Sequence, residues 1–398
     1  MLNRELSTAM MVAVGAFALG MASYATAGLI PMIETELSVS VSLAAQLVTA
    51  FTLAYGLGSP LLVAVLPAHR QRIGLLGSLA IFVIANVASA LANDIVTLIV
   101  LRAVAGIGAG VYLALGIAAA ASLAGERRRG KAIAIVMGGM ASGTVLGVPV
   151  SLLLAERLGW QAAFWLIAML GGVTLLGMLW RLPTLPDTPS VSMRSKLAVM
   201  ADRRVVAILG VSLLAAIASL GMYTFIAPFV AAYAESETIS VTPFLWVWGI
   251  GGVVGSFLVG AVVDRVRGPK VTLGIMLLLA TALILLPVLA PYRLALTMLP
   301  LVVWGAVGWA LQVPQNDELF KARSTAGDGH LAIALNESAL YLGSAIGSAV
   351  GGVILAMQWP VWGLAVGAAA IAMLGAVLQC ALVVQEGRRV RELDAPVA

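Results

Sequence analysis

The chain consists of long apolar runs separated by short polar segments. A membrane-spanning helix needs about 20 mostly apolar residues, because the hydrocarbon core of a bilayer is about 30 Å thick. Strands of a membrane barrel would instead be about ten residues long and would alternate in polarity. The pattern therefore predicts an all-α integral membrane protein. Its twelve transmembrane helices are predicted near residues 8–31, 43–67, 73–92, 95–123, 131–155, 161–180, 205–233, 243–263, 270–290, 294–316, 330–356 and 360–384.

The composition supports a surface that faces lipid. Of the 398 residues, 61% are hydrophobic and only 10% are charged, whereas soluble domains are about half apolar and a quarter charged. Too few polar side chains remain to cover a water-facing surface. The single cysteine, Cys380, makes no disulfide within the chain and says nothing about the redox compartment.

Basic residues fall almost entirely on one side of the predicted spans. With the N-terminus in the cytoplasm, 20 of the 23 Lys and Arg residues lie in cytoplasmic segments, Arg157 and Arg293 lie outside, and Arg102 lies within the fourth span. Positive residues favour the cytoplasmic side of a membrane. The distribution predicts that both termini are cytoplasmic. It explains the net charge of +5 without nucleic-acid binding.

The two halves of the chain share features about 200 residues apart. Gly58-Ser59 ends the second run as Gly255-Ser256 ends the eighth, and glycines recur every fourth residue in the fifth and eleventh runs. We therefore expect two parallel six-helix bundles, residues 1–182 and 205–398, joined by a cytoplasmic linker at 183–204. Parallel repeats favour a site between the bundles near the membrane midplane. The glycine stripes fit either static close packing or a surface on which the bundles slide.

Three motifs lead to a family resemblance. The fourth run contains Arg102 within LIVLRAVAGIGAG (98–110), the fifth contains Gly139, Gly143 and Gly147 before Val148-Pro149, and the eighth ends in G-x-x-x-x-G-x-x-x-D-R (255–265). With the twelve runs in two sets of six, these motifs resemble the major facilitator superfamily. Within it they are similar to the twelve-helix drug:proton antiporter group, which also contains sugar, nucleoside and chloramphenicol exporters. The resemblance implies export by proton antiport through alternating access.

The chain departs from the family pattern at three positions. Pro67 stands where a gating aspartate would align, Val150 replaces the usual glycine after the proline of the export motif, and Ser23 stands where many relatives carry an acid in helix 1. The resemblance therefore supplies no proton-binding acid in helix 1.

Two ionisable residues, Arg102 and Glu337, lie well inside predicted spans. Such charges are costly in a membrane and tend to be functional. The resemblance implies that Arg102 senses the protonation of a nearby acid, and the alternative is that it binds backbone carbonyls between helices. A carboxylic acid in a medium of low dielectric constant favours its neutral form, so Glu337 is predicted to carry the coupled proton or to balance a cationic solute. The alternative is a solvated or paired glutamate near the cytoplasmic end of its span.

Other polar and aromatic residues are candidates for a substrate cavity, although each is also an ordinary packing residue in isolation. They are Ser23, Thr26, Tyr112, Ser219, Tyr223, Trp304, Gln312, Asn336 and Tyr341. Such a lining suits a lipophilic or weakly polar organic solute. For gating, the resemblance implies roles for Asp264 and Arg265, with Arg127–Arg129 and Lys131 as possible partners, and for Gly143, Gly147 and Pro149. The alternative for Asp264 and Arg265 is simple anchoring at the cytoplasmic surface.

The sequence shows no sign of an enzyme or of a bound cofactor. Neither a G-x-x-x-x-G-K-[ST] nor an H-E-x-x-H motif is present, and the two histidines, His69 and His330, are far apart, so no metal site is expected. We therefore predict a monomeric secondary transporter of a bacterial inner membrane that exchanges protons for small, largely lipophilic molecules such as drugs, sugars or metabolites. Uptake or facilitated diffusion in the same fold is the alternative, and a non-transporting membrane sensor is a more distant one.

Overall fold

The structure, a computed structural model, describes residues 2–67, 70–124, 128–183, 185, 199, 201–234, 240–263, 265–323 and 329–393. This part is helical throughout and contains no strand. Twelve of its helical segments are long and apolar enough to cross a membrane, which confirms the predicted all-α fold with twelve spans.

The first six spans are built from ten helical segments. These are α1 (Leu2–Leu37), α2 (Val41–Leu53), the π-helical turn Ala54–Gly58, α3 (Ser59–Val65), α4 (Gln71–Ala90), α5 (Ile95–Ala124), α6 (Arg129–Ser142), the π-helical turn Gly143–Gly147, α7 (Val148–Leu158) and α8 (Gln161–Arg181).

The last six spans are likewise interrupted in places. Their segments are α10 (Arg203–Thr224), α11 (Ile226–Ala232), α12 (Thr242–Val263), α13 (Gly268–Leu289), the 3₁₀ turn Leu294–Thr297, α14 (Met298–Ala310), α15 (Gln312–Arg323), α16 (Gly329–Ala356) and α17 (Trp362–Leu393).

Prolines explain where the helices deviate from regular α geometry. A proline lacks an N–H group, and its ring clashes with the carbonyl four residues earlier. Each π-helical turn contains the residue four positions before a proline, Pro60 or Pro149. A π turn inserts one residue into the helix and relieves this crowding. Pro31 and Pro287, by contrast, lie within continuous helices.

Two spans that the sequence predicted as single runs are broken. The predicted run 205–233 is divided at Phe225, one residue after Thr224, which lies four positions before Pro228. The predicted run 294–316 is divided at Leu311. The residue before this break, Ala310, likewise lies four positions before a proline, Pro314. The second of these runs also continues to Arg323, seven residues beyond the predicted end.

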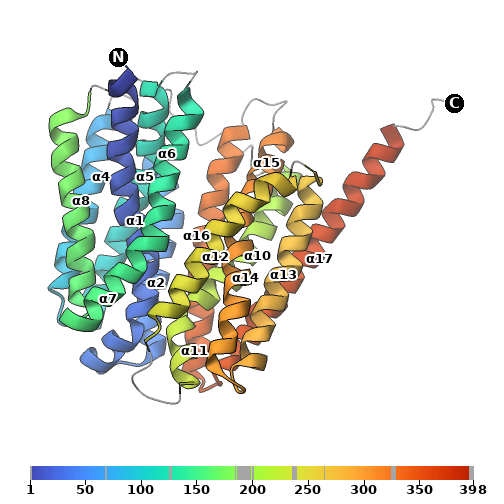
Figure 1. Ribbon diagram of the computed structural model, residues 1–398. Coiled ribbons are helices and arrows are strands. Elements are labelled where there is room, and N and C mark those ends of the chain that lie inside the picture. Colours follow the sequence, from blue (N-terminus) through green and yellow to red (C-terminus); the bar gives the residue numbers. More distant parts are fainter. Residues whose placement is uncertain are drawn as a thin grey trace. The chain divides into compact units, whose positions relative to one another are not determined.

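The chain forms two compact units. The first unit comprises Met1–Ser192, Tyr223–Trp246 and Ser344–Val361, and the second comprises Met193–Met222, Val247–Gly343 and Trp362–Ala398. In the first unit, α1 packs against α5, α6 and α8, while α4 packs against α5 and α8 (Figure 1). In the second unit, α13 packs against α14, α15 and α17.

Several glycines lie where two backbones touch. A Cβ atom on Gly139 or Gly143 would meet a backbone carbonyl of α1, and one on Gly106 would meet the carbonyl of Phe51. In the second unit, a Cβ atom on Gly343 would likewise meet the carbonyl of Leu213 on α10. Since lipid provides no hydrophobic drive for helix association, small residues allow the close contact that holds such helices together. These contacts agree with the static-packing interpretation of the glycine stripes.

Candidate functional site

Arg102 is the most deeply buried charged residue of the first unit. It lies on α5 with no exposed surface, and its Nη2 donates a 2.7 Å hydrogen bond to the carbonyl of Ala22 on α1. The guanidinium carbon lies 4.3 Å from the ring centre of Phe51 and 5.5 Å from that of Phe164. Gly106, one turn along α5, brings α2 close enough for the Phe51 ring to reach the guanidinium.

These contacts leave the positive charge of Arg102 incompletely compensated. A desolvated cation–π contact contributes about 2 kcal/mol, whereas burial of an ion costs several kcal/mol after the surroundings relax. The Nε and Nη1 atoms of Arg102 have no hydrogen-bond partner in the described part of the chain, and no described carboxylate pairs with it. The bond to Ala22 agrees with the carbonyl-binding alternative, and a proton-sensing role for Arg102 stays a prediction.

The other first-unit candidates lie along α1 and its neighbours. Ser23 donates to the carbonyl of Leu19 at 2.9 Å, whereas the hydroxyl of Thr26 is buried without a hydrogen bond to any described group. Tyr112 donates to the carbonyl of Val12 at 3.1 Å. Tyr223, which belongs to this unit, packs edge-on against Tyr24 with ring centres 5.4 Å apart. Ser23 and Thr26 therefore lie near the carbonyl that Arg102 binds, while Tyr112 contacts a different part of α1.

The predicted gating residues are only partly described. Gly143 and Gly147 begin and end the π-helical turn, and Pro149 follows in the first turn of α7. Arg265 is exposed at the end of α12, and Asp264 lies outside the described residues. A gating role for these residues stays a prediction.

Trp304 and Ser219 form a buried pair in the second unit. The indole Nε1 of Trp304 on α14 donates a 2.7 Å hydrogen bond to Oγ of Ser219 on α10. Trp248 of α12 lies between two indoles, with its ring centre 6.2 Å from that of Trp304 and 6.1 Å from that of Trp309. Edge-to-face contacts at this spacing are favourable. The structure thus brings two predicted cavity residues into one aromatic cluster.

Glu337 is a half-buried carboxylate on α16. Among the described residues it has neither a hydrogen bond nor an ion pair. The preceding residue, Asn336, is buried and donates from Nδ2 to Oδ1 of Asn316 on α15 at 2.8 Å. Tyr341 is buried one turn further along α16, whereas Gln312 is half-buried at the start of α15. Three of the predicted residues, Asn336, Glu337 and Tyr341, therefore share one stretch of α16.

A further carboxylate, Glu318, is buried although its sequence context predicts a loop. It lies on α15 with 5% of its surface exposed, and it accepts a 3.2 Å hydrogen bond from Thr272 Oγ1 on α13. The predicted tenth span ended at residue 316, which placed Glu318 in a polar loop. The Gln-Asn-Asp-Glu composition of 315–318 favoured that end. Only the packing of α15 against α13 shows that the helix continues with one face buried.

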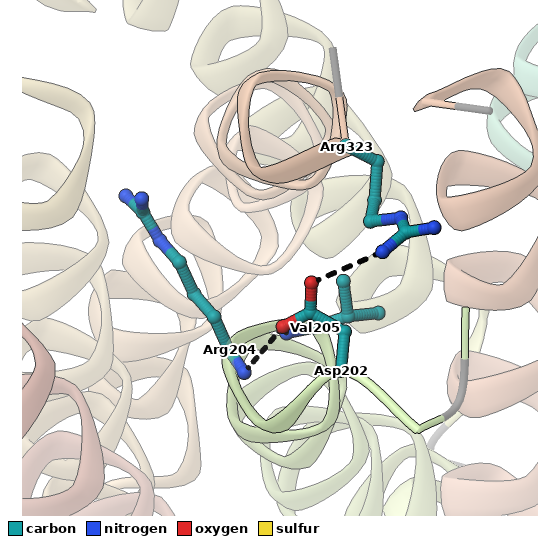
Figure 2. A network of polar contacts seen from close by, with 4 residues as sticks. All are labelled: Asp202, Arg204, Val205 and Arg323. Atoms are coloured by element: carbon teal, nitrogen blue, oxygen red, sulfur yellow. Dashed lines mark hydrogen bonds and ion pairs between the residues drawn. The ribbon is translucent and has the colours of Figure 1, made fainter. Parts of the chain in front are cut away.

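The polar end of the same unit holds a network around Asp202 (Figure 2). Its Oδ1 accepts from the backbone nitrogen of Arg204 at 2.9 Å, and its Oδ2 lies 3.3 Å from Nη1 of Arg323. Partial burial raises the pKa of Asp202, but the backbone hydrogen bonds and Arg323 outweigh it, so that the pKa lies below its ordinary value. Asp202 therefore caps α10 and joins it to the end of α15 as a carboxylate.

No metal site is evident in the described part of the chain, because no three His, Cys, Asp or Glu side chains gather there. Its polar groups are instead few, separated and surrounded by apolar helices. Such an arrangement is typical of a polytopic helical membrane protein.

The chain belongs to the Major Facilitator Superfamily, because the model of that family matches residues 12–317. It is 30% identical over 344 residues to the inner membrane transport protein YdhP of Escherichia coli K12, a match that covers 86% of this chain and 87% of that protein. It is also 30% identical over 275 residues to a chloramphenicol resistance protein of Streptomyces lividans, covering 66% and 70% respectively. With twelve apolar spans and such relatives, the protein is an integral inner-membrane protein of a transporter family.

Solved structures show the same fold. The nucleoside transporter NupG, crystallised as a point mutant, matches with a TM-score of 0.74 over 95% of this chain and 99% of that chain, at 15% sequence identity. A bacterial homologue of the human lysosomal transporter Spinster, in an inward-facing and unoccupied conformation, matches with a TM-score of 0.70 over 94% and 96% at 16% identity.

Proposed function

We propose that the protein is a secondary active transporter that exports small, largely lipophilic organic molecules in exchange for protons. The observation that supports this most is the environment of Glu337. This carboxylate is half-buried in an apolar spanning helix and has no hydrogen-bond or ion-pair partner among the described residues. Carboxylates inside a membrane are rare, and they mark ion and proton pathways.

The chemistry of Glu337 suits a proton carrier. An unpaired carboxylate inside the span alternates between a neutral state, which is stable in an apolar environment, and a charged state, which needs water or a cation. We infer that Glu337 binds a proton when its site is open to the outside. It releases that proton to the cytoplasm when the site opens inward, while the solute moves in the opposite direction. The hydrogen bond between Asn336 and Asn316 holds the start of α16 against α15 beside the carboxylate.

Two observations support export as the direction of transport and a lipophilic molecule as the solute. The chloramphenicol resistance protein among the relatives favours export of a small organic molecule. The second-unit candidates Trp304, Ser219 and Tyr341 are aromatic or weakly polar, which suits a lipophilic solute. We infer that residues 1–182 and 205–398 act as two bundles that rock about this solute, with both termini in the cytoplasm. In this account, Arg265 and the segment Gly143–Pro149 act in gating: they change their contacts as the two bundles move.

A second candidate function is uptake or facilitated diffusion without proton coupling. The observation that favours it is the environment of Arg102, because no described carboxylate lies beside the guanidinium to share a proton with it. In this alternative Glu337 binds a cationic group of the solute, and the direction of transport follows the solute gradient alone.

Accumulation of a panel of fluorescent and antibiotic solutes in a host without its own drug pumps separates these candidates. Export by proton antiport predicts lower accumulation when the protein is present, and it predicts that collapse of the proton gradient removes the difference. A difference that survives the collapse contradicts proton coupling. Higher accumulation in cells with the protein contradicts export.

A further inference from the structure

Two buried groups of the first unit have hydrogen-bond donors without a partner in the described part of the chain, and the Ala22–Thr26 turn of α1 relates them. Arg102 is fully buried, and its Nε and Nη1 have no partner in the described part of the chain. The hydroxyl of Thr26, 1% exposed on α1, has none either. Both are hydrogen-bond donors, and a guanidinium stays positively charged in proteins. The pair therefore presents donors and positive charge for which the described residues supply no acceptor of opposite charge.

The carbonyl of Ala22 links these two groups. A threonine within a helix usually donates its hydroxyl to the carbonyl four residues earlier, as Thr52 does to Val48 at 2.8 Å. For Thr26 that carbonyl belongs to Ala22, which instead accepts the Nη2 of Arg102 at 2.7 Å. The carbonyl that a threonine at position 26 would usually bind is thus occupied by Arg102. The Thr26 hydroxyl is left one helical turn from the residue that anchors the guanidinium.

Among the described residues, the surroundings of Arg102 offer attraction but no counter-charge. The rings of Phe51 and Phe164 lie 4.3 and 5.5 Å from the guanidinium carbon. Their faces attract a cation weakly, but they provide neither a lone pair nor a full negative charge. A buried charge is normally paired or converted to a neutral form. Arginine is not deprotonated in proteins, so its charge has to be paired.

We propose that Arg102 and Thr26 form a binding site for a small monovalent anion, which balances the buried guanidinium. The anion accepts hydrogen bonds from the free Nε–H and Nη1–H groups of Arg102 and from the Thr26 hydroxyl. A halide ion and the carboxylate group of a solute have the chemistry that this site recognises. The site is independent of Glu337 and of proton antiport, because it follows from the contacts of Arg102 and Thr26.

Anion-dependent stability of the purified full-length protein in detergent tests this site. Sodium chloride replaces sodium isethionate, a larger anion without a carboxylate, at constant ionic strength, and the midpoint of thermal unfolding is followed by intrinsic fluorescence. We expect a saturable rise of the midpoint with chloride in the wild-type protein. Sodium acetate, titrated in the same way, serves as the carboxylate probe. Saturation by both anions assigns the site to carboxylate-sized ligands, and saturation by chloride alone assigns it to halides.

Three variants connect the effect to these residues. Thr26→Val keeps the shape and removes one donor, so the apparent affinity for chloride should fall about 3- to 10-fold. Arg102→Gln should abolish the response. Ser23→Asp, which places a carboxylate in the residue after Ala22, should also abolish it, since the protein then supplies its own counter-charge. Arg157→Gln, a change at an exposed residue at the end of α7, should leave the response unchanged.

The proposal is overturned if the wild-type midpoint does not depend saturably on either anion. It is also overturned if Thr26→Val responds as the wild type does, or if Arg157→Gln loses the response as fully as Arg102→Gln. Thr26→Val is a near-isosteric change, so the test remains decisive even if Arg102→Gln or Ser23→Asp fails to fold.

Discussion

Asn336 of α16 donates a 2.8 Å hydrogen bond from its Nδ2 to Oδ1 of Asn316 on α15. The bond joins two helices immediately before Glu337, the only acid of α16. Asn336 has 1% of its surface exposed, so its amide has little access to water if the bond is lost. The orientation of the carboxylate on α16 is therefore tied to the packing of α15.

A double-mutant cycle measures this link. Asn316→Ala and Asn336→Ala should each destabilise the protein, and together they should lose less than the sum of the single losses, with a coupling of about 0.5–1.5 kcal/mol. Unfolding in mixed detergent micelles gives the free energies. Additive losses would show that the two amides do not interact in the folded protein.

Adjacent glycines on α6 provide a matched test of helix packing. A methyl group on Gly139 meets the backbone of Ala13 on α1, whereas one on Gly138 finds nothing within 4 Å. Gly139→Ala should therefore cost about 1–3 kcal/mol through overpacking, while Gly138→Ala should be neutral or stabilising by up to about 1 kcal/mol. Thermal unfolding of both variants in one detergent checks the prediction. Equal effects would contradict the close contact between α6 and α1.

The indole of Trp304 depends on a single acceptor. Ser219→Ala removes the oxygen that its Nε1 binds at 2.7 Å and leaves a buried donor unpaired, so we expect a loss of about 1–3 kcal/mol. Trp304→Phe removes the donor together with part of the ring and leaves a cavity. Trp180→Phe serves as a control, because Trp180 is 88% exposed and should tolerate the change. A Ser219→Ala variant as stable as the wild type would contradict the buried hydrogen bond.

The charge of Asp202 should stabilise the protein in a pH-dependent way. Its pKa is lowered in the folded state, so its contribution is present above the ordinary pKa of aspartate, about 3.9, and is lost as the pH falls through the lower folded value. Asn caps helices about as well as Asp, so Asp202→Asn isolates the charge. We expect a loss of up to about 1 kcal/mol at pH 7, which shrinks as the pH falls below about 4.

Two further variants separate the charge of Asp202 from its capping role. Asp202→Ala also removes the acceptor for the Arg204 and Val205 backbone nitrogens, so it should cost more than Asp202→Asn at every pH. Arg323→Gln should lose the ion pair with Asp202 while the hydrogen bonds from the Arg204 and Val205 backbone nitrogens remain. Chemical unfolding between pH 3 and 7 checks all three variants. A difference between Asp202→Asn and the wild type that does not change with pH would contradict the stabilising charge.

The length of the hydrophobic runs was sufficient to predict the spans. In lipid, each spanning helix must satisfy its own backbone hydrogen bonds and expose apolar side chains, so each span is visible in the sequence by itself. The breaks at Phe225 and Leu311 and the two π-helical turns were not predicted. Each lies near a proline, yet Pro31 and Pro287 remain in continuous helices. Whether a proline breaks a helix depends on the neighbours that satisfy the freed carbonyl, and a single sequence does not show those neighbours.

The candidate site was predictable only in part, for a related reason. Arg102 and Glu337 stood out because a charge within an apolar run is visible in the sequence. Glu318 did not, since the polar residues before it resemble a loop, and its burial comes from contact with α13. The Thr26 hydroxyl, which has no partner in the described part of the chain, was also hidden, because the carbonyl it would usually bind accepts from Arg102, a contact between residues 80 apart in the sequence.

Solute-driven proton movement tests the role of Glu337 most directly. Purified protein is placed in liposomes that contain a pH-sensitive dye, and an outward-directed gradient of a solute identified in the cellular panel is imposed. The wild type should acidify the lumen, because protons enter as the solute leaves. Glu337→Gln should abolish the pH change, while Glu318→Gln, which alters the buried acid of α15, should retain it at lower protein stability. A Glu337→Gln variant that moves protons at the wild-type rate would contradict proton antiport through this residue.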